Sequence, residues 1–171
     1  MNVKVMAAMS GGVDSSAAAF LLREAGYTAV GATMKLWCPD TPDAGWKRDI
    51  DDARAVCDRL EIPHVVLDYS DEFRRTVIAD FAAEYAAGRT PNPCVVCNKR
   101  VKFGFMQDAA AQMDCAAVAT GHYARVEKCG DRFLVRRAVD ESKDQSYVLW
   151  RLSQQQLAHV LLPLGGMRKA E

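Results

Sequence analysis

The sequence predicts a single α/β domain, in which a parallel sheet carries helices on both faces. Short apolar runs alternate with amphipathic segments four times along the chain, a pattern typical of strands joined by crossover helices. A glycine-rich turn, residues 9–16, lies between the first apolar run and the first amphipathic segment. The 171 residues are enough for one well-buried domain and too few for two ordinary ones. We therefore expect one domain over residues 1–171.

The first two predicted strands are each followed by a helix. Residues 3–8 form a short apolar run of the kind that parallel sheets bury, and the Ala- and Leu-rich residues 15–25 predict a helix. A second β-prone run over 28–36 leads into a loop, 38–45, that contains two prolines. Residues 49–60 carry apolar side chains at helical spacing, so we expect a helix there.

Two further strands and their helices follow. Residues 64–67 predict the third strand, and Ser70 is expected to cap a long amphipathic helix that ends at Gly88. A proline-punctuated loop then leads to a helix predicted over 98–113, and residues 116–119 predict the fourth strand.

From about residue 123 the sequence predicts a hairpin and a tail. Two β-prone runs, 123–128 and 132–138, flank a Gly-Asp pair, as in a hairpin. The tail predicts one short helix over 153–160.

The carboxyl ends of parallel strands meet at one edge of the sheet, where ligands bind in open α/β folds. The segments that follow those ends here are the glycine-rich turn, residues 34–37, Asp68, and Gly121 with His122. We therefore expect these segments to share one crevice.

The turn over residues 9–16 has the composition of a phosphate-binding loop. Glycines allow the backbone to approach an anion closely, and the unpaired N–H groups at the start of the next helix point toward it. The turn has neither a Gly-Lys-Ser/Thr ending nor a Gly-x-Gly-x-x-Gly pattern, so Walker A and dinucleotide loops are excluded. Asp14 lies in the first helical turn, where it would repel a pyrophosphate unless Mg²⁺ bridged the two. We therefore predict ATP with Mg²⁺ as the ligand.

Composition places the chain among globular proteins without a bulk charge for nucleic acid. Hydrophobic residues make up 50% and charged residues 26% of the chain, and 22 basic residues balance 22 acidic ones. Residues 86–107, however, contain no acid but include Arg89, Lys99, Arg100 and Lys102. This cluster indicates either a phosphate-binding patch or a solvated face.

The sequence predicts a cytoplasmic protein without a membrane segment. No apolar run approaches the ~20 residues that a membrane helix needs, and the first residues lead directly into the glycine turn without a signal peptide. The six cysteines are then expected to be reduced, so their spacing indicates metal binding or catalysis.

Cys94 and Cys97 form a Cys-x-x-Cys pair in the loop before the predicted helix at 98–113. Three interpretations are open: half of a zinc or iron–sulfur site, a redox pair, or a nucleophile whose pKa is lowered by the helix N-terminus and the neighbouring basic residues.

Four motifs stand in one order along the chain. They are Ser10-Gly11-Gly12-Val13-Asp14-Ser15-Ser16, then Gly88-Arg89-Thr90-Pro91-Asn92-Pro93 with Cys97-Asn98-Lys99, then Ala119-Thr120-Gly121-His122-Tyr123, and finally Lys143-Asp144-Gln145-Ser146-Tyr147. Together they resemble the tRNA-specific 2-thiouridylase family, a branch of the N-type ATP pyrophosphatases. The resemblance covers nearly the whole chain, from residue 3 to about residue 163.

The resemblance implies a Rossmann-like fold of the adenine nucleotide alpha hydrolase type and a two-step reaction. ATP adenylates the C2 oxygen of the wobble uridine of tRNA, and persulfide sulfur then displaces AMP to give 2-thiouridine. It also implies two partners, tRNA and a sulfur-donor protein that relays persulfide from a cysteine desulfurase.

The family's site residues carry over to matching positions. The implied ATP-binding residues are Ala8, Met9, Ser10, Gly11, Gly12, Val13, Asp14, Ser15, Met34 and Gly121. The implied residues at the target base and the tRNA are Asn92, Pro93, Cys94, His122, Lys143, Asp144 and Gln145. Cys97 matches the family's nucleophilic cysteine.

The sequence departs from the family pattern in two ways. Many members have an aspartate where Cys94 stands, so the acid–base role of that position is in doubt and a [4Fe-4S] cluster on Cys94, Cys97 and a third cysteine becomes a hypothesis. Cys38, in the loop after the second strand, is the candidate third ligand. The family also continues into a segment with a second catalytic cysteine and a C-terminal β-barrel, so we expect a fragment or truncated gene product that is competent for ATP and whose complete thiolation is in doubt.

Most other tempting residues are expected to be structural. Cys57 and Cys115 fall on apolar faces, and Cys129 lies at the predicted hairpin turn. His64 is expected to pack and His159 to be solvated without a partner. Trp37 and Trp46 flank a loop near the crevice, where core packing and base stacking are both open.

Two alternative functions remain. One is another AMP-forming ligase of the same superfamily, related to argininosuccinate or lysidine synthetases, which would not need the cysteine pair. The other is a module that binds ATP and tRNA without catalysing the reaction.

Overall fold

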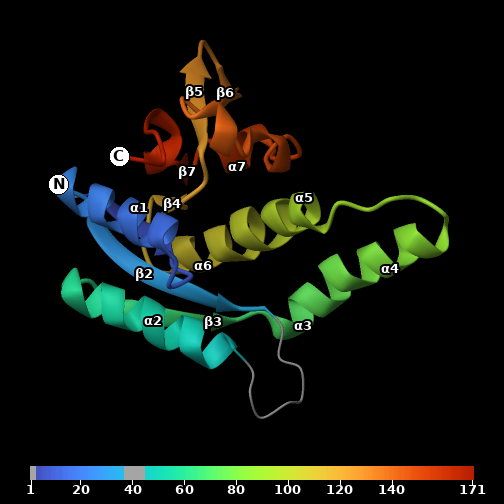
Figure 1. Ribbon diagram of the computed structural model, residues 1–171, viewed down its shortest axis with the longest axis horizontal. Helices are drawn as coiled ribbons and strands as arrows, with labels where there is room; N and C mark the ends of the chain where they lie inside the picture. Colours follow the sequence, from blue (N-terminus) through green and yellow to red (C-terminus); the bar gives the residue numbers. More distant parts are fainter. Residues whose placement is uncertain (1–2, 37–44) are drawn as a thin grey trace.

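The computed structural model describes residues 3–36 and 45–171, and a parallel sheet lies at its centre (Figure 1). The strand order is β3-β2-β1-β4-β7, and all neighbouring pairs are parallel. The strands are β1 (Lys4–Ala8), β2 (Thr28–Lys35), β3 (His64–Asp68), β4 (Ala117–Ala119) and β7 (Val160–Leu161).

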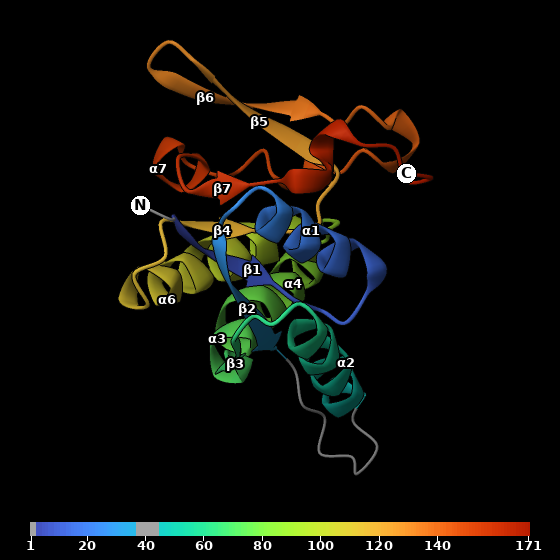
Figure 2. The same ribbon diagram turned by 90° about the vertical axis from the view of Figure 1, so that its left-hand side faces the viewer.

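Helices cover both faces of this sheet, which confirms the predicted α/β class (Figure 2). Side chains alternate along β1, so Val5 and Ala7 pack against one pair of helices while Met6 packs against the opposite helical layer. The first layer is α1 (Val13–Glu24) and α2 (Trp46–Arg59). The second comprises α3 (Ser70–Phe73), η1 (Arg74–Ile78), α4 (Ala79–Ala86), α5 (Pro93–Cys97), η2 (Asn98–Phe105) and α6 (Met106–Gln112), where η1 and η2 are π-helical.

The sheet reverses its direction of growth next to β1. The chain runs outward from β1 through β2 to β3 and then returns to add β4 on the other side of β1. In doubly wound sheets the crevice at such a switch point is the usual ligand site. The carboxyl ends of β1 and β4 border it here.

The tail supplies a fifth strand that the sequence did not predict. The helix expected over 153–160 is limited to α7 (Gln154–Leu157), and Val160 and Leu161 instead pair with β4. A two-residue strand is too short to show an alternating pattern, so only its pairing partner identifies it.

The cap of the helix after β3 was assigned to the wrong residue. Helix α3 already includes Ser70, and the Asp68 carboxylate accepts hydrogen bonds from the Ser70 N–H (3.1 Å) and hydroxyl (2.6 Å). Tyr69 occupies the N-cap position without a side-chain cap hydrogen bond, and Asp68 satisfies only the Ser70 N–H.

The helix predicted from residue 98 begins five residues earlier, at Pro93. Proline is favoured at the first helical position, because its missing N–H is not needed there. The Asn92 side chain caps this end by accepting a hydrogen bond from the Val95 N–H at 3.3 Å. The cysteine pair therefore lies within a helix and not in a loop.

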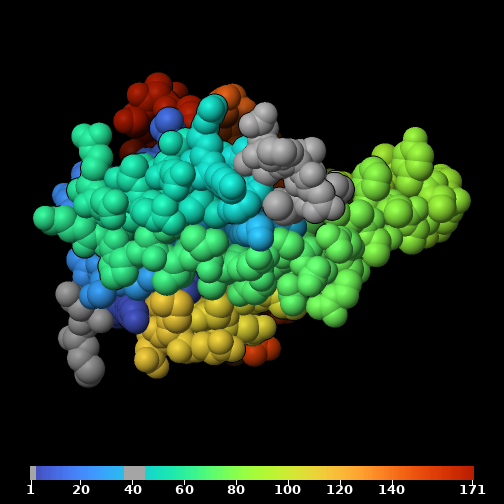
Figure 3. Space-filling model, turned by 90° about the horizontal axis from the view of Figure 1, so that it is seen from below, coloured from blue at the N-terminus to red at the C-terminus, as the bar shows by residue number. Residues whose placement is uncertain are grey.

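Two features project from the sheet and its helices. The predicted hairpin is confirmed as β5 (Ala124–Cys129) and β6 (Arg132–Arg137), an antiparallel pair beyond β7 (Figure 2). Helix α4, which has no buried residue, forms an arm that extends away from the body (Figure 3). Within the described ranges, no helix combines the length and apolar character needed to cross a bilayer.

Candidate functional site

A cavity of about 200 Å³ lies at the carboxyl ends of β1 and β4, at the switch point of the sheet. Its walls bring together residues from all the segments that were expected to share a crevice, except Asp68. They are Ala8, Met9, Ser10, Asp14, Ser15, Met34, Lys102, Thr120, Gly121, His122 and Gln145. Asp68 lies on β3, two strands away from β1, and its carboxylate forms an ion pair with Lys35 at 2.7 Å. Hydrogen bonds from Lys35 and Ser70 lower the pKa of Asp68 to about 2.

Serine hydroxyls fix the turn at the base of this cavity. The Ser15 hydroxyl donates to the Gly12 carbonyl at 2.8 Å and accepts from the Ser10 N–H at 3.2 Å. Helix α1 has no side-chain cap, so the N–H groups of its first turn are available to an anion. This is the geometry that the glycine-rich motif predicted for a phosphate site.

Gly121 brings the loop after β4 into direct contact with the start of α1. A Cβ atom at this position would lie 2.7 Å from the Asp14 carbonyl carbon and 2.9 Å from the Ser15 nitrogen. Those are backbone atoms, which cannot swing aside as a flexible side chain does. Only glycine therefore lets the two loops close around the cavity.

Asp14 already has a cationic partner, Lys169, which the sequence did not point to. The Lys169 ammonium forms an ion pair with the Asp14 carboxylate and lies 5.7 Å from the centre of the Tyr123 ring. The Tyr123 hydroxyl donates to the same carboxylate at 3.4 Å. The site thus supplies one carboxylate oxygen for Mg²⁺ and one ammonium group, and both suit a pyrophosphate.

His122 is a buried, neutral wall of the cavity. Its Nδ1 is hydrogen-bonded to the Thr120 hydroxyl at 2.7 Å. Burial, and to a lesser extent the Lys102 ammonium, lower the pKa of His122 to about 3. The imidazole therefore contributes hydrogen bonding without charge near neutral pH.

The buried imidazole predicts a pH dependence of stability. The unfolded chain protonates His122 below its ordinary pKa of about 6.5, whereas the folded protein does not. Its contribution is therefore complete above pH 6.5 and is lost as the pH falls toward 3. Between pH 7.5 and 5.0 we expect wild type to lose up to about 2 kcal/mol more unfolding free energy than His122→Asn, measured by urea denaturation. Equal losses in the two proteins would contradict this assignment.

Cys97 is more buried and less acidic than predicted. It packs among apolar side chains of η1, α5 and η2, and burial raises its pKa, an effect that Lys102 only partly offsets. The interpretation that relied on a lowered pKa was wrong, because burial outweighs the Lys102 ammonium and because Cys97 lies more than one turn into the helical stretch that begins at Pro93. Cys94, one turn earlier, is exposed.

The cysteine turn is braced by Asn98. The Asn98 amide donates to the Cys94 carbonyl at 2.9 Å, and its buried Oδ1 has no hydrogen-bond partner among the described residues. The predicted base-contacting residues Asn92, Pro93 and Cys94 belong to this turn and do not line the cavity.

The third predicted tRNA segment is a tight loop before η4 (Ser146–Val148). Asp144 accepts hydrogen bonds from the Ala138 N–H and the Ser146 hydroxyl, and it pairs with Arg137 at 3.5 Å instead of with Lys143. Gln145 reaches the cavity, where its side chain accepts a hydrogen bond from the Tyr123 N–H. Of this segment, only Gln145 therefore joins the candidate site.

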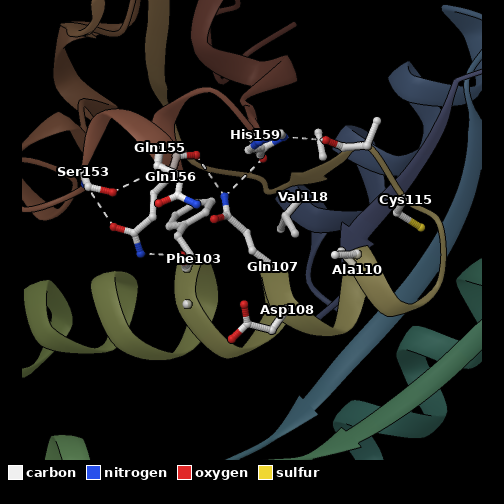
Figure 4. Close-up of a pocket in the computed structure, with 14 residues that line it drawn as sticks. Phe103, Gln107, Asp108, Ala110, Cys115, Val118, Ser153, Gln155, Gln156 and His159 are labelled. Atoms are coloured by element: carbon white, nitrogen blue, oxygen red, sulfur yellow. Dashed lines mark hydrogen bonds between the residues drawn. The ribbon is translucent and has the colours of Figure 1, made fainter.

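A larger cavity, about 500 Å³, lies between α6, α7 and the amino end of β4 (Figure 4). Its amide groups are already used in packing α7 onto the helix below. Gln107 donates to the carbonyls of Gln156 and His159, and the Gln156 amide donates to the Lys99 carbonyl. The His159 ring also bonds to the Ala116 carbonyl, so the prediction that it lacks a partner was wrong. The smaller cavity, beside the uncapped start of α1, is therefore the candidate nucleotide site.

The predicted environments of three further cysteines are confirmed. Cys57 and Cys115 are buried, and Cys129 is exposed on the hairpin. Trp46 begins α2 with the Lys35 and Lys47 ammonium groups over its ring. Cys38 and Trp37 lie outside the described residues.

The sequence profile of one protein family matches residues 3–171, and that family is described as the tRNA methyl transferase HUP domain. The chain belongs to this family. The resemblance and the nucleotide-binding fold predicted from the four motifs are thereby confirmed.

The curated relatives of this HUP domain are named tRNA-specific 2-thiouridylase MnmA. The chain is 47% identical to the protein of Clostridium botulinum over 97% of its own length and 48% of the relative. It is 49% identical to the protein of Moorella thermoacetica, again over 97% of its length and 49% of the relative. The chain thus spans about half the length of the curated relatives it matches.

Two solved structures share the fold of this HUP domain. One is the U34-tRNA thiolase NcsA from Methanococcus maripaludis with its [4Fe-4S] cluster, at a TM-score of 0.51, 21% identity and coverage of 71% of this chain and 39% of that one. The other is a predicted subunit of tRNA methyltransferase from Methanocaldococcus jannaschii, at a TM-score of 0.54, 18% identity and coverage of 98% and 71%.

The described part of this HUP domain does not by itself complete an iron–sulfur site. Cys94 and Cys97 are two of the thiolates that such a cluster requires, and within residues 3–36 and 45–171 no group of three His, Cys, Asp or Glu side chains comes together. Since Cys38 lies outside that range, the cluster stays a prediction, and we derive no step through it.

Proposed function

We propose that this chain is the ATP-binding half of a tRNA-uridine 2-sulfurtransferase. The observation that carries the proposal is the cavity at the switch point, where the turn after β1, Met34 and the Gly121 loop meet. Family membership and the names of the relatives support tRNA as the acceptor.

The adenylation step suits this cavity. A uridine carbonyl oxygen is a poor leaving group. Attack of the C2 oxygen on the α-phosphate of ATP releases pyrophosphate and gives an adenylated uridine, from which the oxygen can later leave as part of AMP. This step needs neutralisation of charge around the pyrophosphate more than it needs an acid–base pair. The free N–H groups of α1 and the Lys169 and Lys102 ammonium groups supply it here. Mg²⁺ held by Asp14 would add Lewis-acid stabilisation.

The sulfur step is assigned to the cysteine turn. A donor persulfide attacks C2 of the adenylated uridine and expels AMP, so the uridine then carries the donor through an S–S bond. Attack of the Cys97 sulfur on the donor's own cysteine sulfur leaves the transferred sulfur on C2 and forms a disulfide between Cys97 and the donor, which a thiol reductant reopens. Burial of Cys97 disfavours its free thiolate, so we infer that Lys102 and the bound tRNA complete its activation. Cys94, exposed on the same helix, is proposed to contact the target base.

The proposal is tested by separating the two steps. The chain is incubated with ATP, Mg²⁺ and an unmodified tRNA transcript that carries U34 or C34, and AMP and pyrophosphate are measured. We expect pyrophosphate release with U34 only. Bound ATP and tRNA without pyrophosphate release would point instead to the binding module.

A substitution at Cys97 is expected to break only the second step. With a persulfide donor present, Cys97→Ser should reduce 2-thiouridine by more than about 100-fold, in line with loss of a nucleophile, while U34-dependent pyrophosphate release persists. Mass spectrometry of digested tRNA measures the product, and Cys129→Ser, an exposed cysteine on the hairpin, is the matched control. Unchanged 2-thiouridine in Cys97→Ser would show that Cys97 is not the nucleophile of the sulfur step.

A further inference from the structure

A second cavity, about 400 Å³, is strongly basic and lies on the side of the molecule that carries the cysteine helix. Three segments that are far apart in the sequence form it: η1 with the start of α4, the α5–η2 helix, and the turn after η4. Its lining residues are Arg75, Thr76, Asp80, Val96, Lys99, Arg100 and Arg151. Four cations therefore face one carboxylate in this basic pocket.

The positive charge of the basic pocket is largely uncompensated. Arg75 pairs with Glu72 at 3.4 Å. Over residues 3–36 and 45–171, however, Lys99, Arg100 and Arg151 form no ion pair within 4 Å. Like charges that the fold brings together repel one another, and a bound anion relieves that repulsion. The chain as a whole has no net charge, so this concentration is local.

The composition of the pocket favours a nucleic acid over a small anion. Arg100 and Arg151 are exposed, and the Arg151 guanidinium lies 5.9 Å from the Trp150 ring, which is 70% exposed. Cations spread over a wide opening, beside an exposed aromatic ring, suit a backbone with several phosphates and adjacent bases. A single phosphate is instead held by converging N–H groups in an enclosed site.

The basic pocket also lies next to the proposed base-binding turn. Cys94, Cys97 and Arg100 belong to one continuous helical stretch. At a rise of 1.5 Å per residue, Arg100 is about 9 Å along the axis from Cys94. A nucleotide at the cysteine turn therefore has its neighbouring phosphates within reach of Lys99 and Arg100.

We propose that the basic pocket binds phosphodiester groups of the tRNA backbone adjacent to the target uridine, with Arg100 and Arg151 as its principal cations. This inference rests on the proposed function, because it takes tRNA as the acceptor.

The test is the salt dependence of tRNA binding. Arg100→Gln and Arg151→Gln are compared with wild type and with Arg59→Gln, which removes an exposed charge at the end of α2. Each pocket variant should bind an unmodified tRNA transcript about 3- to 10-fold more weakly at 0.1 M salt. The slope of log K against log salt should shrink by about 0.7–0.9 per cation removed. Arg59→Gln should match wild type, Arg100→Lys should restore the slope, and ATP affinity should not change.

Each contradictory result of this experiment would overturn a different claim. If wild type binds tRNA and the Gln variants keep its affinity and slope, the pocket is not a phosphate site, while the proposed function stands. If affinity falls with an unchanged slope, the arginines are structural and the inference is wrong. If wild type binds ATP but no tRNA, the proposed acceptor and the pocket assignment both fall. Displacement of tRNA by millimolar inorganic phosphate at constant ionic strength would reassign the pocket to a small anion.

Discussion

Gly121→Ala is expected to abolish most ATP binding while leaving the fold in place. The added Cβ would lie 2.7 Å and 2.8 Å from the Asp14 carbonyl carbon and oxygen and 2.9 Å from the Ser15 nitrogen. Real Cβ atoms do not approach backbone this closely, so the start of α1 must move away from the β4 loop. Overpacking of this kind costs roughly 1–3 kcal/mol. If this cost is subtracted from the free energy of ATP binding, the affinity falls by about 5- to 150-fold.

Calorimetric titration with Mg²⁺-ATP measures this effect, and circular dichroism establishes that the variant is folded. Gly166→Ala is the matched control, because a Cβ there would have no atom within 4 Å. If Gly121→Ala binds ATP as tightly as Gly166→Ala does, the cavity beside α1 is not the nucleotide site.

The sequence predicted the parts of the fold that local patterns encode. Four strands, the helices that follow them and the hairpin all lie where apolar spacing and glycine turns placed them. The sequence pattern predicts a loop at Asn92 and Pro93, whereas these two residues cap and begin α5. Strand β7 was missed because two residues carry no periodicity, and its identity depends on pairing with β4.

The candidate site also contains some residues that the sequence predicts and others that only the fold reveals. The glycine-rich motif and Gly121 were predictable, since their conformations follow from residue type and short spacing. Lys169 contacts Asp14 across 155 positions, and no local pattern announces such a pair. The pKa of Cys97 was predicted in the wrong direction, because sequence neighbours reveal charge but not burial. Lys102 was identified as basic, yet only the fold shows that it lines the candidate nucleotide cavity.

Gly165→Ala is expected to cause a large loss of stability. Gly165 is buried where η5 (Pro163–Gly166) crosses β5, and a Cβ there would lie 1.8 Å from the Ala124 carbonyl oxygen. The Gly165 carbonyl also accepts a hydrogen bond from the Val139 N–H at 3.0 Å. Accommodating one methyl group therefore requires η5 to separate from the hairpin. We expect a loss of about 3 kcal/mol in unfolding free energy, the upper part of the usual range for overpacking.

The neighbouring glycine, Gly166, provides a matched control for this prediction. Gly166→Ala adds the same methyl group one residue later, where no atom lies within 4 Å, and should change stability by less than about 0.5 kcal/mol. Urea denaturation of the two variants measures the difference directly, and similar midpoints would show that η5 does not pack on β5 as described. Because η5 also precedes Lys169, release of this segment should withdraw the ammonium group from Asp14. Gly165→Ala should therefore weaken Mg²⁺-ATP binding even at temperatures where it remains folded, whereas Gly166→Ala should bind ATP normally.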